Sequence, residues 1–334
     1  MKKVISNTVV FLITFIALYG ATEFAFRMYT KSTIIYDIEM HKYAKSLKQR
    51  SSYPGLSHEH VANSQAHLMG VDCKINNVGF RDEPLAEVKP ANIKRIFVVG
   101  SSITFGWGIP YDSVFTQRLE KQLNHVPSDT VIEVVNSGIG NYNTVLEAIL
   151  FKRNVDRVNP DRVILHYFIN DAEVISPKSA NWLIANSYFT AYMYVRVKQM
   201  LATSSKGGSI GTYYKSLYQA DNKGWQAAQQ AILEIKQACD SKVIPFTLLI
   251  QPDLHDLKES GDLYDCYRVI TDFADNNKVP YLNLFPAYAR EFGADDPRNI
   301  WVHPDDSHPN IAGHRVIFEQ LYHYLAGQRE TIIN

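Results

Sequence analysis

A serine in the first third of the chain and a histidine near its C-terminus have the surroundings that nucleophilic catalysis requires. Residues 100–106 read GSSITFG, where the flanking glycines allow a sharp turn that exposes the hydroxyl of Ser102. Residues 303–314 read HPDDSHPNIAGH, with Asp305 three residues before His308 in a loop stiffened by proline. A serine becomes a nucleophile when an oriented base takes its proton. We therefore expect Asp305 to bind Nδ1 of His308 and Nε2 to face Ser102.

Both segments also allow other interpretations. Glycine and serine are common in ordinary turns, so residues 100–106 alone are weak support for a nucleophile. The missing lysine of the GxxxxGK[ST] pattern argues against a phosphate-binding loop there. A metal site is the alternative for residues 303–314, although their spacing differs from the HExxH pattern of helical zinc sites. We expect neither a metal nor a cofactor.

Two further segments contain donors suited to an anion. Residues 136–144, NSGIGNYNT, contain Gly140 and Asn141 in a flexible turn whose backbone amides can point at a negative charge. Residues 168–171, FIND, place the side-chain amide of Asn170 beside a carboxylate. The alternative for both segments is that their polar side chains cap helices.

The elements that must bring these segments together alternate along the chain. Short runs rich in β-branched or aromatic residues predict strands at 95–99, 131–135, 162–167, 243–250 and 281–284. Apolar residues at helical spacing predict helices at 114–123, 144–155, 225–238, 263–276 and 311–325. This alternation is typical of a doubly wound α/β domain with a parallel sheet, which binds ligands at the carboxyl ends of its strands. The serine segment and both donor segments directly follow predicted strands.

In order and spacing, the four segments resemble the four sequence blocks of the SGNH hydrolase family, also called GDSL esterases. The resemblance extends over residues 95–325 and is most specific in Asp305-x-x-His308-Pro309-Asn310. It implies a flavodoxin-like parallel sheet of about five strands. It also implies a carboxylic ester hydrolase.

The resemblance assigns a role to each candidate residue. Ser102 is the nucleophile, His308 the general base, and Asp305 its orienting partner. The oxyanion hole would consist of the side-chain amide of Asn170 and the backbone amides of Ser102, Gly140 and Asn141.

Three positions depart from the family pattern. Ser101 replaces the usual aspartate before the nucleophile, and Phe168 replaces the glycine that opens the third block. The glycine of the second block aligns nearer Asn141 than Gly140. None of these departures removes a triad residue or a required hydrogen-bond donor, since Asn141 still has its backbone N–H.

The N-terminus contains a candidate membrane span. Two lysines precede residues 4–22, which contain no charge and are about as long as the roughly 20 residues that cross a bilayer. Lysines before a span favour a cytoplasmic N-terminus. A cleaved signal peptide is less favoured because the bulky Leu18 and Tyr19 precede Ala21, where a signal peptidase requires small residues. We predict a single-pass anchor with the catalytic domain on the extracytoplasmic side; a cleaved signal and a buried helix remain alternatives.

The rest of the chain divides by composition. We expect a membrane anchor at 1–30, a neck and connecting segment at 31–89, and a hydrolase domain at 90–334. Residues 172–222 form an insertion rich in tyrosine between the third and fourth predicted strands. The insertion is interpreted as extra helices packed on the domain, or as a lid or substrate wall.

Composition excludes several classes of protein. The chain has 334 residues and is 46% hydrophobic, so it can bury a core and is not wholly disordered. Its 34 basic and 34 acidic residues give a net charge of zero, which argues against nucleic acid as a partner. The three cysteines form no CxxC pair, which excludes a zinc ribbon. On the extracytoplasmic side a disulfide between Cys239 and Cys266 is permissible.

These observations predict a membrane-anchored serine esterase. Because extracytoplasmic family members often act on O-acetyl groups of glycans, we expect an acylated carbohydrate as substrate and a lipid ester as the second choice. An O-acyltransferase is one alternative, and a non-catalytic glycan-binding or assembly protein is another.

Overall fold

The chain forms two compact units. The structure is a computed structural model that describes residues 2–175, 181–203 and 210–327. The first unit contains Met1–Ser46, Leu68–Gly70 and Lys178–Gly207. The second contains Leu47–His67, Val71–Pro177 and Gly208–Asn334. Residues 31–89, expected to form a neck, are therefore divided between the units, and most of them belong to the second.

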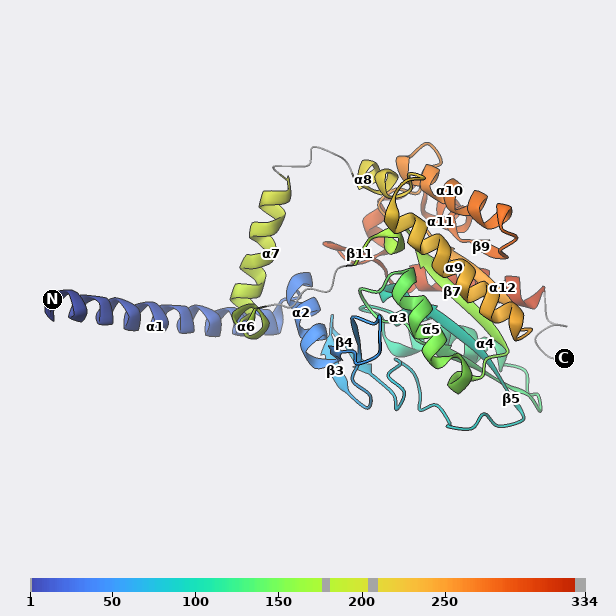
Figure 1. Ribbon diagram of the computed structural model, residues 1–334, viewed down its shortest axis with the longest axis horizontal. Helices are drawn as coiled ribbons and strands as arrows, with labels where there is room; N and C mark the ends of the chain where they lie inside the picture. Colours follow the sequence, from blue (N-terminus) through green and yellow to red (C-terminus); the bar gives the residue numbers. More distant parts are fainter. Residues whose placement is uncertain (1, 176–180, 204–209, 328–334) are drawn as a thin grey trace. The chain divides into compact units, whose positions relative to one another are not determined.

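A five-stranded parallel sheet forms the centre of the second unit (Figure 1). Its strands are β5 (Ile93–Gly100), β6 (Val131–Asn136), β7 (Arg162–Phe168), β8 (Phe246–Gln251) and β9 (Tyr281–Asn283). Their order in the sheet is β6-β5-β7-β8-β9, and all pairs are parallel. Numbered from β5 to β9, this is the flavodoxin-like order 2-1-3-4-5. The predicted fold class is confirmed.

Helices cover both faces of this sheet. Alternate residues of β5 face opposite sides, so Phe97 belongs to one apolar cluster and Val98 to the other. The first cluster packs against α5 (Thr144–Val158), α9 (Lys223–Ser241) and α10 (Asp262–Asn276). The second packs against α4 (Phe115–Leu123), α11 (Phe285–Phe292) and α12 (Ile311–Ala326). Burial on both sides explains why the strands are apolar runs without alternation.

One predicted strand begins later than expected. The run 243–250 predicts a strand from Val243, but β8 begins at Phe246. Val243 has a φ of 58° and is 89% exposed, because it turns the chain after α9. A β-branched residue in this left-handed conformation cannot continue a strand.

Three two-stranded antiparallel pairs accompany the sheet. β1 (Lys48–Arg50) pairs with β2 (His58–His60), and β3 (Gln65–Leu68) pairs with β4 (Val71–Lys74). β10 (Trp301–His303) pairs with β11 (Asp306–Pro309). Short helical segments complete this unit: α3 (Ser102–Phe105), η1 (Tyr111–Ser113), η2 (Ile169–Ala172), α8 (Ile210–Leu217) and η3 (Pro297–Ile300).

The first unit is helical. It consists of α1 (Lys2–Ser32), α2 (Tyr36–Ser46), α6 (Trp182–Asn186) and α7 (Tyr188–Thr203). Within α1, residues Ile5–Ser32 are long and apolar enough to cross a membrane. The helices α6 and α7 come from the predicted insertion 172–222. They pack with the N-terminal helices, whereas α8, which comes from the same insertion, belongs to the second unit and packs on α10.

The cysteines are buried free thiols. Cys239 lies in α9 and Cys266 in α10, and neither forms a disulfide in the part of the chain that is described. Burial raises the pKa of Cys239 to about 12 and that of Cys266 to about 11. The permissible Cys239–Cys266 disulfide is absent from this structure.

Candidate active site

Ser102 lies at the carboxyl end of β5, where it begins the short helix α3. The backbone turns sharply here because the chain leaves a buried strand and enters a helix within two residues. The loop after β6 passes close beside α3, and a Cβ atom at Gly138 would lie 2.1 Å from the backbone nitrogen of Phe105. Only glycine allows this approach. The turn therefore presents the Ser102 side chain at the edge of the sheet.

His308 faces the serine hydroxyl. Its Nε2 lies 2.7 Å from Oγ of Ser102, a hydrogen bond between residues 206 positions apart in the sequence. His308 lies on β11, which pairs with β10 just before α12. The hairpin thus brings the base to the serine, and the predicted contact between Ser102 and His308 is present.

The acid beside His308 is Asp306 and not the predicted Asp305. Oδ1 of Asp306 lies 2.5 Å from Nδ1 of His308 and also accepts a hydrogen bond from the backbone N–H of His308 at 3.2 Å. Asp305 is exposed, and its backbone N–H donates to Nδ1 of His303. The physical reason is the strand: Asp306 and His308 are two apart on β11 and point to the same face, whereas Asp305 precedes the strand and lies in the turn after β10.

Trp107 holds the other oxygen of the acid. Its indole N–H donates to Oδ2 of Asp306 at 2.8 Å, and both side chains are buried. Burial alone would raise the pKa of Asp306. The charge of His308 and the hydrogen bonds from His308 and Trp107 outweigh burial and hold this pKa below its usual value. Asp306 is therefore kept ionised and oriented toward the imidazole.

Asn141 occupies the turn after β6 in a left-handed conformation. Its φ is 66°, which glycine adopts freely and which asparagine tolerates better than other residues. This is the position to which the second-block glycine of the resembled family aligns. The departure from glycine therefore keeps the backbone conformation, and with it the direction of the Asn141 N–H.

Two side chains from the β1–β2 hairpin bind the peptide group that contains this N–H. Nζ of Lys48 donates to the carbonyl of Gly140 at 2.6 Å and to Oδ1 of Asn141 at 3.0 Å. Nε2 of His58 lies 3.0 Å from the same carbonyl. A carbonyl only accepts, so His58 carries its proton on Nε2. Burial lowers the pKa of Lys48 to about 7 and, with the Lys48 charge, that of His58 to about 4.

This arrangement affects the donor strength of the turn. In a trans peptide the Gly140 carbonyl and the Asn141 N–H point in opposite directions. Donors on the carbonyl oxygen polarise the peptide and strengthen the N–H as a donor. Lys48 and His58 therefore both orient and polarise the predicted oxyanion donor of Asn141.

Asn170 lies in η2, directly after β7. Its position at the carboxyl end of a strand next to β5 places it at the same edge of the sheet as Ser102. Its Oδ1 is buried and has no hydrogen-bond partner in the described chain. The side chain is thus not fixed by the helix-capping contact that was the alternative interpretation.

Asp171, the residue after Asn170, forms a pair of buried carboxyl groups with Glu147. Glu147 of α5 and Asp171 of η2 are both fully buried. One oxygen of Asp171 accepts the Phe168 N–H at 2.9 Å, while both oxygens of Glu147 lack a partner among the described residues. Burial raises the pKa of both groups, and the charge of Asp171 raises that of Glu147 further. Two neighbouring buried carboxyl groups do not both ionise, because their negative charges repel each other.

Arg81 fixes the backbone that follows the nucleophile. Its guanidinium is buried and donates to the carbonyls of Phe105, Gly106 and Ile109 at 2.6 to 2.9 Å. These carbonyls belong to the chain that leaves α3. The segment before the sheet, expected to act as a neck, therefore supports the site through Arg81 as well as through Lys48.

Of the sequence-predicted residues, the structure brings Ser102 and His308 into contact and leaves Asp305 outside. Sequence reasoning missed four residues of the site: Lys48, His58, Trp107 and Asp306. The spacing Asp-x-His within a short strand was a usable signal for the acid. The other three have no local signal, because they reach the site from other elements. No cluster of three or more metal-binding side chains occurs among the described residues.

One family model matches the chain. The model of the GDSL-like lipase/acylhydrolase family matches residues 98–316. No curated protein sequence matches the chain.

Several solved structures are similar to the chain at low identity. An acetyl xylan esterase is 20% identical to this chain, with a TM-score of 0.41. The match covers 69% of this chain and 99% of the esterase. The structure of TesA is 15% identical, with a TM-score of 0.45, and the match covers 70% of this chain and 99% of TesA. A two-domain esterase active on acetylated mannans is 14% identical with a TM-score of 0.43, covering 70% of this chain. The match spans about half of that esterase, 49% of its length.

Proposed function

Because the chain belongs to the GDSL-like lipase/acylhydrolase family, a family of carboxylic ester hydrolases, we propose that it is a serine esterase with Ser102 as nucleophile. In this proposal His308 is the general base and Asp306 orients it. The observation that carries the proposal is the continuous hydrogen-bonded series from Oγ of Ser102 through the imidazole to the buried Asp306 carboxylate.

The reaction follows from these contacts. Oγ of Ser102 attacks the ester carbonyl carbon while Nε2 of His308 takes the hydroxyl proton. The imidazolium that forms is stabilised by Asp306, and it then donates the proton to the departing alcohol. Water, activated by the same nitrogen, attacks the acyl-serine and releases the acid. Each half of the reaction returns His308 to its neutral form.

The tetrahedral intermediate needs donors for its negative oxygen. We assign this role to the backbone N–H groups of Ser102 and of the Gly140–Asn141 turn, and to the side-chain amide of Asn170. Loss of one such donor typically reduces kcat by about 10²- to 10³-fold. The contacts of Lys48 and His58 with the Gly140 carbonyl support the assignment of the Asn141 N–H.

The substrate that we propose is an O-acetylated glycan outside the cytoplasm. The location follows from the proposed anchor, since lysines precede an uncharged helix and the positive-inside rule then places the body on the extracytoplasmic side. Contacts of α1 support its retention: the Tyr19 hydroxyl donates to Oγ of Ser187 at 2.7 Å. The helix thus forms part of a folded unit, which a cleaved signal would not.

Purified full-length protein in detergent micelles tests this function. Wild type should release acetate from p-nitrophenyl acetate and from at least one member of a panel of acetylated glycans. A phosphonate ester should label Ser102, which mass spectrometry can locate. Addition of acceptor sugars separates hydrolysis from O-acyl transfer, because a transferase yields acetylated acceptor in place of acetate. No labelling and no acetyl release or transfer would show a non-catalytic protein.

A further inference from the structure

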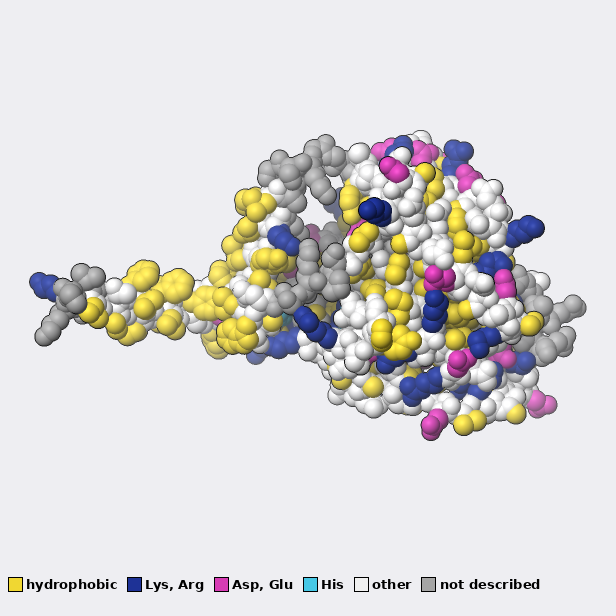
Figure 2. Space-filling view, viewed as in Figure 1, with side chains coloured by type: hydrophobic (Ala, Val, Ile, Leu, Met, Phe, Trp, Pro, Cys, Tyr) yellow, Lys and Arg dark blue, Asp and Glu magenta, His cyan; other side chains and the backbone are white. Residues whose placement is uncertain are grey.

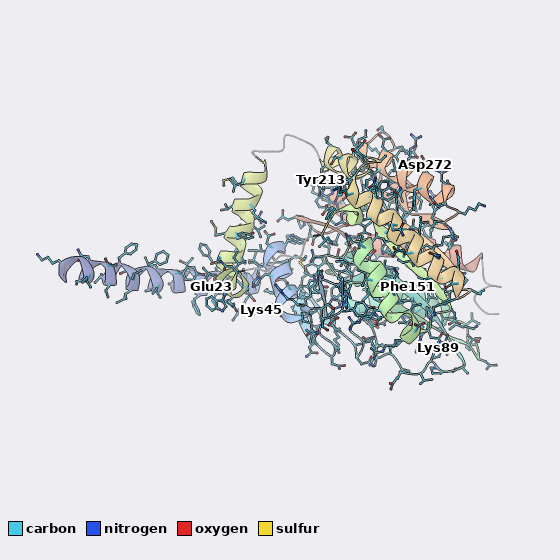
Figure 3. The ribbon with its side chains drawn as sticks, in the orientation of Figure 1. Glu23, Lys45, Lys89, Phe151, Tyr213 and Asp272 are labelled. Carbon is cyan, nitrogen blue, oxygen red and sulfur yellow. The ribbon has the colours of Figure 1, made fainter. Side chains whose placement is uncertain are left out.

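The beginning of α7 is fixed to one level of α1. The Glu23 carboxylate accepts the backbone N–H groups of Tyr188 and Phe189, both at 3.0 Å, and the hydroxyl of Ser187 at 2.8 Å. It therefore caps the N-terminus of α7, as its position at the base of that helix in Figure 3 shows. Phe26 packs against Phe189, with the ring centres 6.0 Å apart.

In the proposed anchor this level is the outer end of the span, because the uncharged run 4–22 within the apolar helix ends at Glu23. Residues 4–23 form about 20 residues of helix, roughly 30 Å, which is the thickness of the hydrocarbon core. With the N-terminal lysines at the cytoplasmic surface, Glu23 lies at the opposite surface. The first residues of α7 are therefore at the boundary between hydrocarbon and headgroups.

From this level α7 runs across the axis of α1 and not along it (Figure 1). A helix that leaves the end of a span in this direction lies parallel to the membrane plane. One side of α7 packs on α2, where Arg196 pairs with Asp37 at 3.0 Å and Tyr188 contacts His41. Because α2 follows the outer end of α1, this side of α7 faces away from the bilayer.

Another face of α7 is apolar and exposed. Its side chains are at helical spacing, and hydrophobic atoms gather along both α7 and α1 in Figure 2. The exposed apolar residues of α7 are Met193, Tyr194, Val197, Met200 and Leu201. Met200 is 70% exposed and Val197 is 47% exposed. In α6, Trp182 is exposed as well, and tryptophan is enriched at membrane interfaces.

We propose that α6 and α7 lie in the headgroup region of the bilayer that α1 crosses, with the exposed apolar face of α7 toward the lipid. The proposal rests on the membrane anchor but not on the esterase activity. An amphipathic helix in this position buries its apolar face at the boundary of the acyl chains. Lys198, which lies over the Tyr194 ring, then meets anionic headgroups. The pair of helices α6 and α7 thus acts as a second membrane contact of the protein.

Environment-sensitive labels test the proposal in proteoliposomes of phosphatidylcholine and phosphatidylglycerol. An NBD fluorophore is attached to V197C or M200C of the full-length protein. The native cysteines are buried, and unsubstituted protein measures their background labelling. V243C is the matched control, because Val243 is the same residue type and is even more exposed. Lipids with a spin label near the headgroup or deep in the acyl chain report contact with lipid.

At positions 197 and 200 we expect blue-shifted emission and quenching that is at least twofold stronger by the shallow spin label than by the deep one. V243C should emit as in water and resist quenching. Emission at both α7 positions like that of V243C would overturn the proposal. So would blue-shifted emission without lipid quenching, which means that protein, such as a second copy of the chain, covers the face. Flotation of the liposomes after an alkaline wash reports the anchor separately, since loss of the protein from them refutes the anchor itself.

Discussion

Asp306 and His308 lie two residues apart on one short strand, and their side chains meet with Oδ1 of the acid 2.5 Å from Nδ1 of the base. The neighbouring Asp305 has the same chemistry but is exposed and lies in the turn before the strand. Because β11 begins at Asp306, only this one of the two adjacent aspartates shares a strand face with the base.

This pair provides a matched test. Asp306→Asn should reduce kcat for p-nitrophenyl acetate by about 10²- to 10⁴-fold, because the amide neither holds the required tautomer nor stabilises the imidazolium. Asp305→Asn should change kcat by less than about twofold, since exposed side chains outside the site rarely matter. Steady-state kinetics with both variants decides the question. A large loss for Asp305→Asn with a small one for Asp306→Asn would contradict the assignment.

Removal of the nucleophile or the base should abolish hydrolysis. Ser102→Ala and His308→Ala act on one unit, so each alone should lower kcat by more than about 10³-fold, and the double variant should lose little more. The melting temperature of each variant should stay near that of wild type, because the folded core is unchanged. Wild-type turnover by Ser102→Ala would refute the serine mechanism.

Lys48 should affect turnover more than substrate binding. Lys48→Met removes the charged donor from the Gly140 carbonyl and weakens the Asn141 N–H, so kcat should fall about tenfold, or about 1.4 kcal/mol of barrier. KM should change little, since the oxyanion forms only after binding. Lys48→Arg should recover part of the loss. Affinity for a boronic acid, whose adduct with serine is tetrahedral, should fall in parallel with kcat.

The control for this variant is Lys152→Met, which removes an exposed lysine of α5 that pairs with Glu234. Its kcat should equal that of wild type. An unchanged kcat for Lys48→Met in an active preparation would show that Lys48 has no part in the oxyanion site, while leaving the serine mechanism intact.

The buried carboxyl pair should make stability depend on pH. Burial raises the folded-state pKa of Glu147 and Asp171, so between their unfolded and folded pKa values the folded protein binds more protons. Their contribution to the free energy of unfolding is therefore present below about pH 4.5 and is lost as the pH rises from there toward the folded pKa values.

Glu147→Gln removes one of these titrations. Relative to wild type, its melting temperature should rise progressively between pH 5 and pH 8, by roughly 2–4 °C for each kcal/mol. Glu87→Gln, at an exposed position, should show no such trend. Thermal unfolding at several pH values measures both. A difference between Glu147→Gln and wild type that does not vary with pH would contradict the assigned ionisation.

The N-terminal helix should remain in the mature protein. Its length, its preceding lysines and the bulky Leu18 and Tyr19 before the nearest small residues argue for an uncleaved anchor. Full-length protein should stay with membranes through high-salt and alkaline washes, and N-terminal sequencing should begin at or near Met1. Soluble protein that begins after Gly20 or Ala21 would identify a signal peptide.

The sequence by itself determined the sheet and two of the reacting side chains. Strands buried on both faces appear in the sequence as short apolar runs, and helices appear as apolar residues at helical spacing. Both patterns are local and can be recognised without the tertiary structure. Ser102 and the Asn141 turn directly follow such strands. In a parallel sheet they therefore lie at the carboxyl edge of the sheet, whatever the arrangement of the other elements. His308 was found because its segment has an order and spacing typical of the family.

The tertiary structure decided what depends on contacts between distant segments. The choice of Asp306 over Asp305 depends on the pairing of β11 with β10. The run of polar residues in this segment does not predict a strand. Lys48 reaches the Gly140 carbonyl across 92 positions of sequence, and Glu23 caps α7 across more than 160. Side chains that meet in this way share no periodicity or motif, because their proximity arises only when separate elements pack together.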